Sequence, residues 1–346
     1  MKAWQVAQLG EPRDVMQFVD VPDPVAGPGQ LVVRVLASPA NFPDVLMCRG
    51  LYQVKPDLPF TPGVELCGEV IAVGPEVDDP RTPDVEEPRS GVTKPRFAIG
   101  DRVLGSAVLP HGGFAEFAVM DQNLTFHAPQ SLDDAEASSL YIGYQTGWFA
   151  LHRRTQIREG ETLLVHAAAG GVGSAAIQLG KAAGAKVIGV VGGSAKAEVA
   201  RALGADVVVD RHEQDFVEVV KAETGGRGAD IIYDPVGGET YARSTKCIAF
   251  EGRILIIGFA GGDIQTAALN HALIKNYSIV GLHWGMYNLY DPPAVLACHD
   301  DLTRMADAGQ IKPLISERLS LAAMGDGVQR LADGKTVGRV VFEATA

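Results

Sequence analysis

The segment that decides the fold is His166-Ala-Ala-Ala-Gly-Gly-Val-Gly173. It follows the apolar run 162–165 and opens a helical pattern that continues toward Gly184. Its spacing matches a variant of the dinucleotide fingerprint, A-x-G-x-x-G, at Ala168, Gly170 and Gly173. Glycine lets the backbone approach a pyrophosphate, and a helix N-terminus offers unpaired N–H groups to the anion. The segment therefore predicts a dinucleotide-binding turn.

Around this turn, short apolar runs alternate with helical patterns. The predicted strands are Thr162–His166, Lys186–Val191, Val207–Val209, Ile231–Tyr233, Ile254–Ile257 and Tyr277–Gly281. Helical patterns fill the gaps at 172–184, 195–203, 213–222, 239–248 and 267–275, and another spans 131–152. Strands joined by crossover helices indicate an α/β fold with a doubly wound, parallel Rossmann sheet, which we place at 128–280.

The N-terminal part, 1–127, has a different character. Apolar runs at 30–38, 64–73, 101–106 and 114–120 predict a β-rich domain punctuated by proline and glycine. The stretch 77–97 carries four prolines among mixed charges, which predicts a surface loop. The C-terminal segment, 281–346, contains two helical and two strand patterns and is expected to return to the N-terminal domain.

Composition excludes several classes of protein. The 346 residues are 47% hydrophobic and 21% charged, which suits a folded chain of about two domains. We find no apolar run long enough for a spanning helix and no secretory signal at the start. Four separated cysteines favour a reducing, cytoplasmic location. The net charge of −12 disfavours a nucleic-acid partner.

The end of the second predicted strand bears on the choice of dinucleotide. An NAD site places an acidic residue there to bind the ribose 2′-hydroxyl. This chain instead has Val191-Gly-Gly-Ser-Ala-Lys196, in which Ser194 offers a hydroxyl and Lys196 a cation. Arg211, just after the third strand, offers a second cation. The pattern favours NADPH, whose 2′-phosphate these groups would bind.

Several motifs identify a resemblance that covers the whole chain. They are Asn41-Phe-Pro-Asp44 with Gly50-Leu-Tyr52, Pro62-Gly-Val-Glu65, Gly100-Asp-Arg-Val103, Gly112-Gly-Phe-Ala-Glu116, the glycine-rich turn, Gly204-Ala-Asp206, Tyr233-Asp-Pro-Val-Gly237 and Gly334-Lys-Thr-Val-Gly338. Together they resemble the medium-chain dehydrogenase/reductase superfamily, and within it the zinc-free NADPH:quinone oxidoreductases related to ζ-crystallin. The resemblance implies a GroES-like β-barrel domain beside the Rossmann domain, and a homo-oligomer, commonly a dimer, whose subunits pair near 277–281.

The resemblance also bears on metal binding. Zinc alcohol dehydrogenases of this superfamily have a cysteine ligand where this chain has Asn41, and a histidine ligand where it has Val64. The histidines of this chain form no H-x-x-H or H-x-x-x-H pair, and its cysteines form no cluster. We therefore expect no metal site and zinc-independent chemistry.

Site residues follow from the same resemblance. It implies catalytic roles for Asn41, beside the nicotinamide, and for Tyr52, which would line the acceptor site. The implied cofactor contacts are Asn41, Phe42, Thr146, Ala169, Gly170, Gly171, Val172, Ser194, Lys196, Arg211, Val236, Gly258, Phe259, Ala260, Leu282, His283, Trp284 and Lys335.

Three functions stay open at this point. The first is an NADPH-dependent oxidoreductase that reduces a quinone, a small planar electrophile. The second is an NADPH-dependent reductase of activated C=C bonds in alkenals, enones or enoyl thioesters, which needs the same hydride and one proton. The third is an NADPH-binding structural or regulatory protein.

Overall fold

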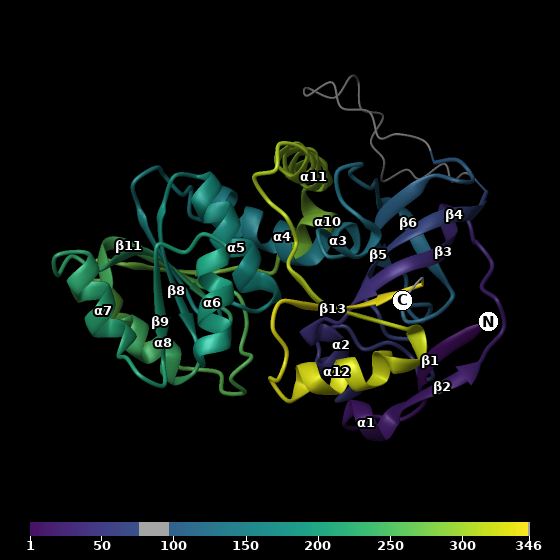
Figure 1. Ribbon diagram of the computed structural model, residues 1–346, viewed down its shortest axis with the longest axis horizontal. Helices are drawn as coiled ribbons and strands as arrows, with labels where there is room; N and C mark the ends of the chain where they lie inside the picture. The colour runs from purple at the N-terminus through teal and green to yellow at the C-terminus, as the bar shows by residue number, and fades with distance from the viewer. Residues whose placement is uncertain (76–96, 345–346) are drawn as a thin grey trace. The chain divides into compact units, whose positions relative to one another are not determined.

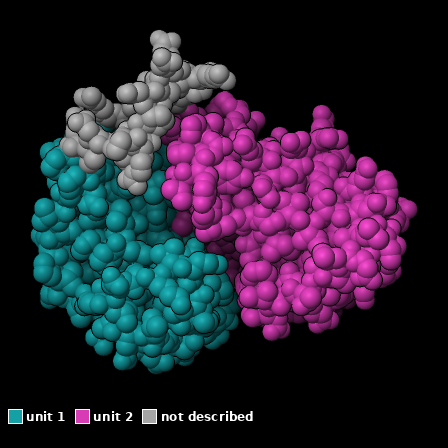
Figure 2. Space-filling model, turned by 180° about the vertical axis from the view of Figure 1, so that it is seen from behind, with its two compact units in different colours: residues 1–141, 317–335, 340–346 teal, residues 142–316, 336–339 magenta. Residues whose placement is uncertain are grey.

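The computed structural model describes residues 1–75 and 97–344. It divides into two compact units, which Figure 2 colours separately. The first contains residues 1–141, 317–335 and 340–346, and the second contains 142–316 and 336–339. The predicted loop at 77–97 lies outside the described residues, apart from Phe97.

The second unit contains a six-stranded sheet. Its strands are β7 (Thr162–Val165), β8 (Lys186–Val191), β9 (Val207–Asp210), β10 (Ala229–Asp234), β11 (Ile248–Ile256) and β12 (Ser278–Gly281). They lie in the order β12-β11-β10-β7-β8-β9, and every pairing is parallel. The predicted doubly wound α/β sheet is confirmed, with β7 and β10 at its centre.

Helices connect these strands, as Figure 1 shows for α5 to α8. They are α5 (Gly171–Ala182), α6 (Ser194–Ala202), α7 (Phe216–Glu223), α8 (Glu239–Ser244) and α9 (Leu269–Lys275). The helix predicted over 239–248 is too long, because the chain turns into the sheet after Ser244. The Cys247 carbonyl accepts the Ala229 N–H at 2.8 Å, so β11 already begins at Ile248.

The helical pattern at 131–152 is divided in the structure. Its parts are α3 (Asp134–Ser138), α4 (Tyr141–Trp148) and a π-helical turn, η1 (Phe149–Arg154). The side chains of Asp133 and Glu136 form a capping box at the start of α3, which explains why the helix begins there. Of these parts, α3 belongs to the first unit, and the remaining elements of the second unit are η2 (Trp284–Met286), α10 (Tyr287–Tyr290) and α11 (Pro292–Asp307).

The first unit is built on a second six-stranded sheet. Its strands are β3 (Gln30–Pro39), β4 (Glu65–Val73), β5 (Arg102–Ala107), β6 (Phe117–His127), β13 (Ile315–Leu319) and β14 (Arg339–Glu343). Because β3 pairs with both β4 and β6, strands β3 to β6 close on themselves as a small antiparallel barrel. This is the predicted β-barrel, with β13 and β14 returning from the C-terminal segment.

Smaller elements cover this barrel. They are β1 (Lys2–Val6) paired with β2 (Met16–Asp20), α1 (Pro12–Val15), α2 (Phe42–Cys48), η3 (Leu321–Ala323) and α12 (Met324–Ala332). Trp4 fixes α12 in place, since its indole N–H donates to the Leu321 carbonyl at 2.7 Å and its ring covers Gly325. In the part of the chain that the structure describes, no helix has the length and apolarity needed to cross a bilayer.

Candidate cofactor and active site

The glycine-rich turn lies at the carboxyl end of β7 and leads directly into α5. Ala167 adopts a left-handed φ of 48°, and the Ala168 N–H donates to the Val190 carbonyl at 3.0 Å. A Cβ on Gly173 would lie 2.2 Å from the Ala167 carbonyl oxygen, so the first turn of α5 packs directly on the bend. Only glycine fits there without moving backbone, which is the role expected from the fingerprint.

A short segment from the C-terminal part supports the same turn. The Gly338 N–H donates to the Ala169 carbonyl at 2.7 Å, and Gly170 and Gly338 form a parallel bridge. Arg339 is buried, and its guanidinium covers Gly171, where a Cβ would lie 2.7 Å from Nη1. The glycine-rich turn is therefore held on one side by β8 and on the other by residues 338 and 339.

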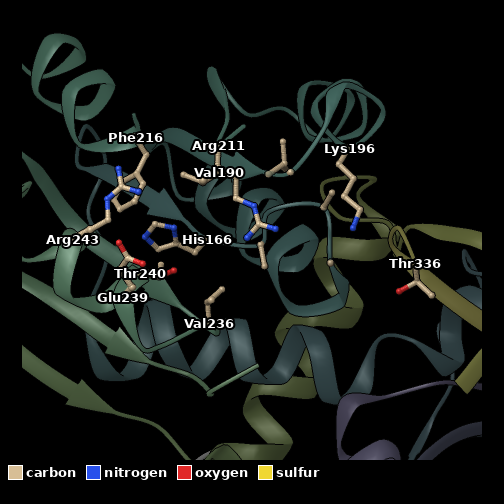
Figure 3. A pocket seen from close by; sticks show the side chains of 15 residues that line it. His166, Val190, Lys196, Arg211, Phe216, Val236, Glu239, Thr240, Arg243 and Thr336 are labelled. Carbon is tan, nitrogen blue, oxygen red and sulfur yellow. The ribbon is translucent and has the colours of Figure 1, made fainter. Parts of the chain in front are cut away.

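A cavity of about 350 Å³ opens beside this turn. Figure 3 shows Arg211 in the middle of its lining, with Lys196 and Thr336 on one side and His166, Phe216 and Arg243 on the other. The predicted cofactor residues that line it are Ala169, Gly170, Lys196, Arg211 and Val236. All of them follow the carboxyl ends of strands or begin helices, where ligands bind in doubly wound sheets.

One end of this cavity is cationic. Arg211 and Lys196 both line it, and Gly192, whose Cβ would lie 3.0 Å from Arg211 Nε, leaves room beside the guanidinium. The Asp210 carboxylate points elsewhere, because Oδ1 accepts the backbone N–H groups of Gly193 at 2.9 Å and His212 at 3.1 Å. Those two bonds keep the pKa of Asp210 below its ordinary value. This end of the cavity is suited to a phosphate.

Sequence reasoning missed the other end of the cavity, which is lined by His166, Phe216, Glu239, Thr240 and Arg243, and it also missed Thr336. His166, Glu239 and Thr240 come after strands of the parallel sheet, and this position could have identified them as candidate site residues. The Arg243 guanidinium lies 4.7 Å from the centre of the Phe216 ring, a contact that only the tertiary structure forms. Thr336 is brought here by the long-range pairing of Gly338.

His166 forms part of the floor of the cavity and is neutral. Its Nε2 lies 2.9 Å from the Ser244 hydroxyl, which donates its own hydrogen to the Thr240 carbonyl at 2.8 Å. Nε2 must therefore be the donor to Ser244, which leaves Nδ1 as an acceptor. Burial, aided by the nearby Arg243 cation, lowers the pKa of His166 to about 3.

In the first unit, Asn41 is a buried amide at the start of α2. Its Nδ2 donates to the Pro39 carbonyl at 3.2 Å and to Glu65 Oε1 at 3.0 Å. Both amide hydrogens are therefore committed, and Oδ1 is the acceptor atom of the side chain, which the capping box of α2 places near the Asp44 N–H. An acceptor at this position suits the N–H of a carboxamide and does not suit a substrate carbonyl.

Asp44 organises the backbone around Asn41. Oδ2 accepts the Asn41 N–H at 2.9 Å, and Oδ1 accepts the N–H groups of Gly63 at 2.9 Å and Val64 at 3.2 Å. Complete burial raises the pKa of Asp44 to about 7 despite these donors. Tyr52 is half-buried against the apolar core, and burial together with the Asp44 charge raises the pKa of its phenol.

The structure does not place the other predicted residues in the lining of the cavity. Gly171 and Val172 begin α5, Ser194 begins α6 and is exposed, and Thr146 bonds back to the Ile142 carbonyl at 2.6 Å. Lys335 pairs with Asp333 at 3.0 Å. Phe42 is the first residue of α2.

Two loops follow adjacent strands at the carboxyl edge of the parallel sheet. Gly258 to Ala260 come after β11, where the Ala260 N–H donates to the Pro235 carbonyl at 3.0 Å. Leu282 to Trp284 come after β12, where the Leu282 N–H donates to the Ile256 carbonyl at 3.2 Å. Their position at this edge agrees with a role in ligand binding, although these residues stay predictions.

The described residues contain no group of three histidine, cysteine or carboxylate side chains arranged to hold a metal ion. The two positions at which zinc relatives have ligands carry an amide, Asn41, engaged with Glu65, and an aliphatic side chain, Val64.

Comparison with known families matches both units. Residues 27–130 match the alcohol dehydrogenase GroES-like domain, and residues 171–298 match the zinc-binding dehydrogenase family. The name of the second family includes zinc, but positions 41 and 64 of this chain carry asparagine and valine.

Individual relatives agree with these matches. The chain is 36% identical to a quinone oxidoreductase-like protein 2 homolog of Nematostella vectensis, over 91% of this chain and 82% of that protein. A quinone oxidoreductase of Pseudomonas syringae is similar in structure, with 31% identity, 99% of both chains covered and a TM-score of 0.85. So is the Escherichia coli quinone oxidoreductase complexed with NADPH, with 28% identity, 99% and 100% coverage and a TM-score of 0.85.

Proposed function

Because the chain belongs to the quinone oxidoreductase-like proteins of the medium-chain dehydrogenase/reductase superfamily, we propose that it reduces quinones with NADPH and without zinc. The observation that carries the proposal is the cavity whose lining combines the glycine-rich turn with the cations Lys196 and Arg211. An oxidoreductase is the activity that the relatives share by name.

The residues of the cavity fit NADPH group by group. A diphosphate fits the start of α5, where Gly173 lets the helix approach the turn and where the first N–H groups of a helix have no partner within the helix. A 2′-phosphate fits the cationic end beside Gly192, and an adenine fits the end that contains Phe216 and Thr240. A similar structure that was solved with NADPH supports this assignment.

NADPH supplies a hydride when it is bound. The chain's own residues orient the reactants: Asn41 Oδ1 accepts a carboxamide N–H, and Tyr52 presents a phenol to a planar acceptor. The pKa of Tyr52 is raised, so this phenol stays protonated and is able to donate a hydrogen bond to a quinone oxygen. Catalysis would rest on placement of two flat rings in a site without bulk water.

The chemistry of the side chains at positions 41 and 64 supports the proposed zinc independence. Asn41 uses its amide nitrogen on Pro39 and Glu65, and Val64 has no donor atom. A catalytic zinc ion needs three protein ligands, and these two positions supply neither a thiolate nor an imidazole.

We also propose a cytoplasmic homodimer that forms through the edge of the parallel sheet. In the described part of the chain β12 pairs with β11 alone, and α9 beside it exposes Leu269, Leu273 and Ile274 at 75%, 78% and 73%. An open edge with apolar residues beside it favours pairing with a second copy. The four cysteines are free and buried, as expected in a reducing compartment.

The acceptor is tested by following NADPH oxidation at 340 nm with 9,10-phenanthrenequinone, 1,4-benzoquinone, 2-hexenal and crotonyl-CoA. We expect the two quinones to be turned over at least about tenfold faster than the alkenes, because a reduced quinone oxygen needs only a hydrogen bond, such as that of the Tyr52 phenol, whereas an alkene needs a proton placed on carbon. Faster turnover of 2-hexenal or crotonyl-CoA would show that the acceptor is an activated alkene and not a quinone. The same panel with NADH measures the preference for the cofactor.

A further inference from the structure

Two nitrogen-bearing side chains converge on the space above Gly192. A Cβ built on Gly192 would lie 3.0 Å from Nε and 3.2 Å from Nη2 of Arg211, and 3.3 Å from Nε2 of His212. Gly192 lines the cavity together with Arg211 and Lys196. The imidazole of His212 therefore lies beside Gly192 and Arg211, which both line the cavity.

Asp210 orients this imidazole. The carboxylate accepts the backbone N–H of His212 at 3.1 Å, and its Oδ1 lies 3.8 Å from the ring Nδ1. The Nδ1 side of the ring faces Asp210, so Nε2 is the nitrogen directed toward Gly192 and Arg211. In the neutral ring only one nitrogen donates, whereas in the protonated ring both do.

We propose that His212 is a specificity-determining residue whose protonated form binds the 2′-phosphate of NADPH together with Arg211. Binding of the phosphate then takes one proton from solution onto His212, and no covalent bond changes. The inference rests on the proposed NADPH function and adds to it a dependence of cofactor affinity on pH.

The charged groups near His212 are of both signs. Arg211 on the same turn, Lys196 on α6 and Arg243 on α8 line the cavity as cations. Asp210 lies beside the ring, and Glu239 is an anion in the same lining. A bound phosphate offsets the cations, and histidine changes its charge between pH 5 and 8.

The experiment is calorimetric titration of the full chain with 2′,5′-ADP at pH 6, 7 and 8, in buffers of different ionisation enthalpy. These buffers report the number of protons taken up, which does not depend on turnover. The variant is His212→Gln, which stays neutral. The control ligand is 5′-AMP, which lacks the 2′-phosphate, and the control variant is His271→Gln, at a histidine on α9.

We expect the unchanged protein to bind 2′,5′-ADP about tenfold more tightly than His212→Gln at pH 6, which is the effect of one charge-assisted hydrogen bond. The two affinities should converge at pH 8, and proton uptake near pH 7 should be larger in the unchanged protein. The ionisation of the phosphate itself contributes equally to both. His212→Arg should bind tightly at all three pH values without the extra proton.

Each other outcome has a distinct meaning. Equal affinity and equal proton uptake in the unchanged protein and His212→Gln would overturn the role of His212 and leave the NADPH proposal intact. If the unchanged protein bound 2′,5′-ADP no more tightly than 5′-AMP, the preference for NADPH itself would be wrong. If His271→Gln lost affinity and proton uptake to the same extent as His212→Gln, the loss would not be specific to His212 and its role would be overturned.

Discussion

Replacement of Gly173 by alanine is expected to weaken NADPH binding roughly 100-fold, because about 3 kcal/mol of crowding falls on the turn that holds the diphosphate. The new Cβ would lie 2.2 Å from the Ala167 carbonyl oxygen and 2.9 Å from the Ala168 Cα. Both contacts are to backbone, so the bend itself must open. Titration of NADPH followed by its fluorescence measures the loss, and thermal melting measures the accompanying loss of stability.

The matched control is Gly281→Ala, at the end of β12. A Cβ at Gly281 would meet nothing within 4 Å, so the same chemical change should leave NADPH affinity within about twofold. If Gly173→Ala also kept its affinity, the close approach of α5 to the turn would not be needed for binding. The assignment of the diphosphate to this turn would then be wrong.

The second large effect is expected for Asn41→Asp, which turns a buried donor into an acceptor. The new oxygen would stand 3.0 Å from Glu65 Oε1 and 3.2 Å from the Pro39 carbonyl, with no hydrogen between them. Two buried hydrogen bonds are lost and a further carboxyl is buried beside Glu65 and Asp44, at a cost of about 2–4 kcal/mol. Urea unfolding at pH 8 measures this loss.

The pH dependence of this variant has a definite sign. A proton on the new carboxyl restores a donor toward Glu65, so the folded state binds that proton more tightly than the unfolded chain does. The deficit should therefore shrink as the pH falls. Asn123→Asp is the same change at an exposed position and should cost less than about 0.5 kcal/mol. Equal losses in the two variants would contradict the role given to the contact between Asn41 and Glu65.

The parallel sheet was predictable because its signals are local. Each strand is a short apolar run, and the segment from His166 to Gly173 specifies both a bend and a helix start through its glycines. The ends of the helices and strands, in contrast, depend on hydrogen bonds between strands that are far apart in the sequence. The predicted helix from 239 ends at Ser244 because Cys247 bonds to Ala229 in the neighbouring strand, a contact invisible in a window of sequence.

The candidate site was likewise predictable where its residues lie close to strands, and not where they depend on contacts between distant segments. Lys196 and Arg211 follow strands, and their place at the edge of the sheet could be inferred from topology. Thr336 reaches the cavity only through the bridge between Gly170 and Gly338, which lie far apart in the chain. Helix α2 of the barrel unit was not predicted although Asn41 and Asp44 form its capping box, because it is only seven residues long and Pro43 lies in its first turn.

The measurement that tests the central claim most directly is reduction of 9,10-phenanthrenequinone by NADPH in protein treated with EDTA, with the zinc content determined in the same sample. We expect turnover at an unchanged rate in metal-free protein, with NADPH preferred to NADH. Activity that disappears with EDTA and returns with zinc would contradict zinc-independent chemistry. Absence of NADPH oxidation with any quinone would contradict the function itself.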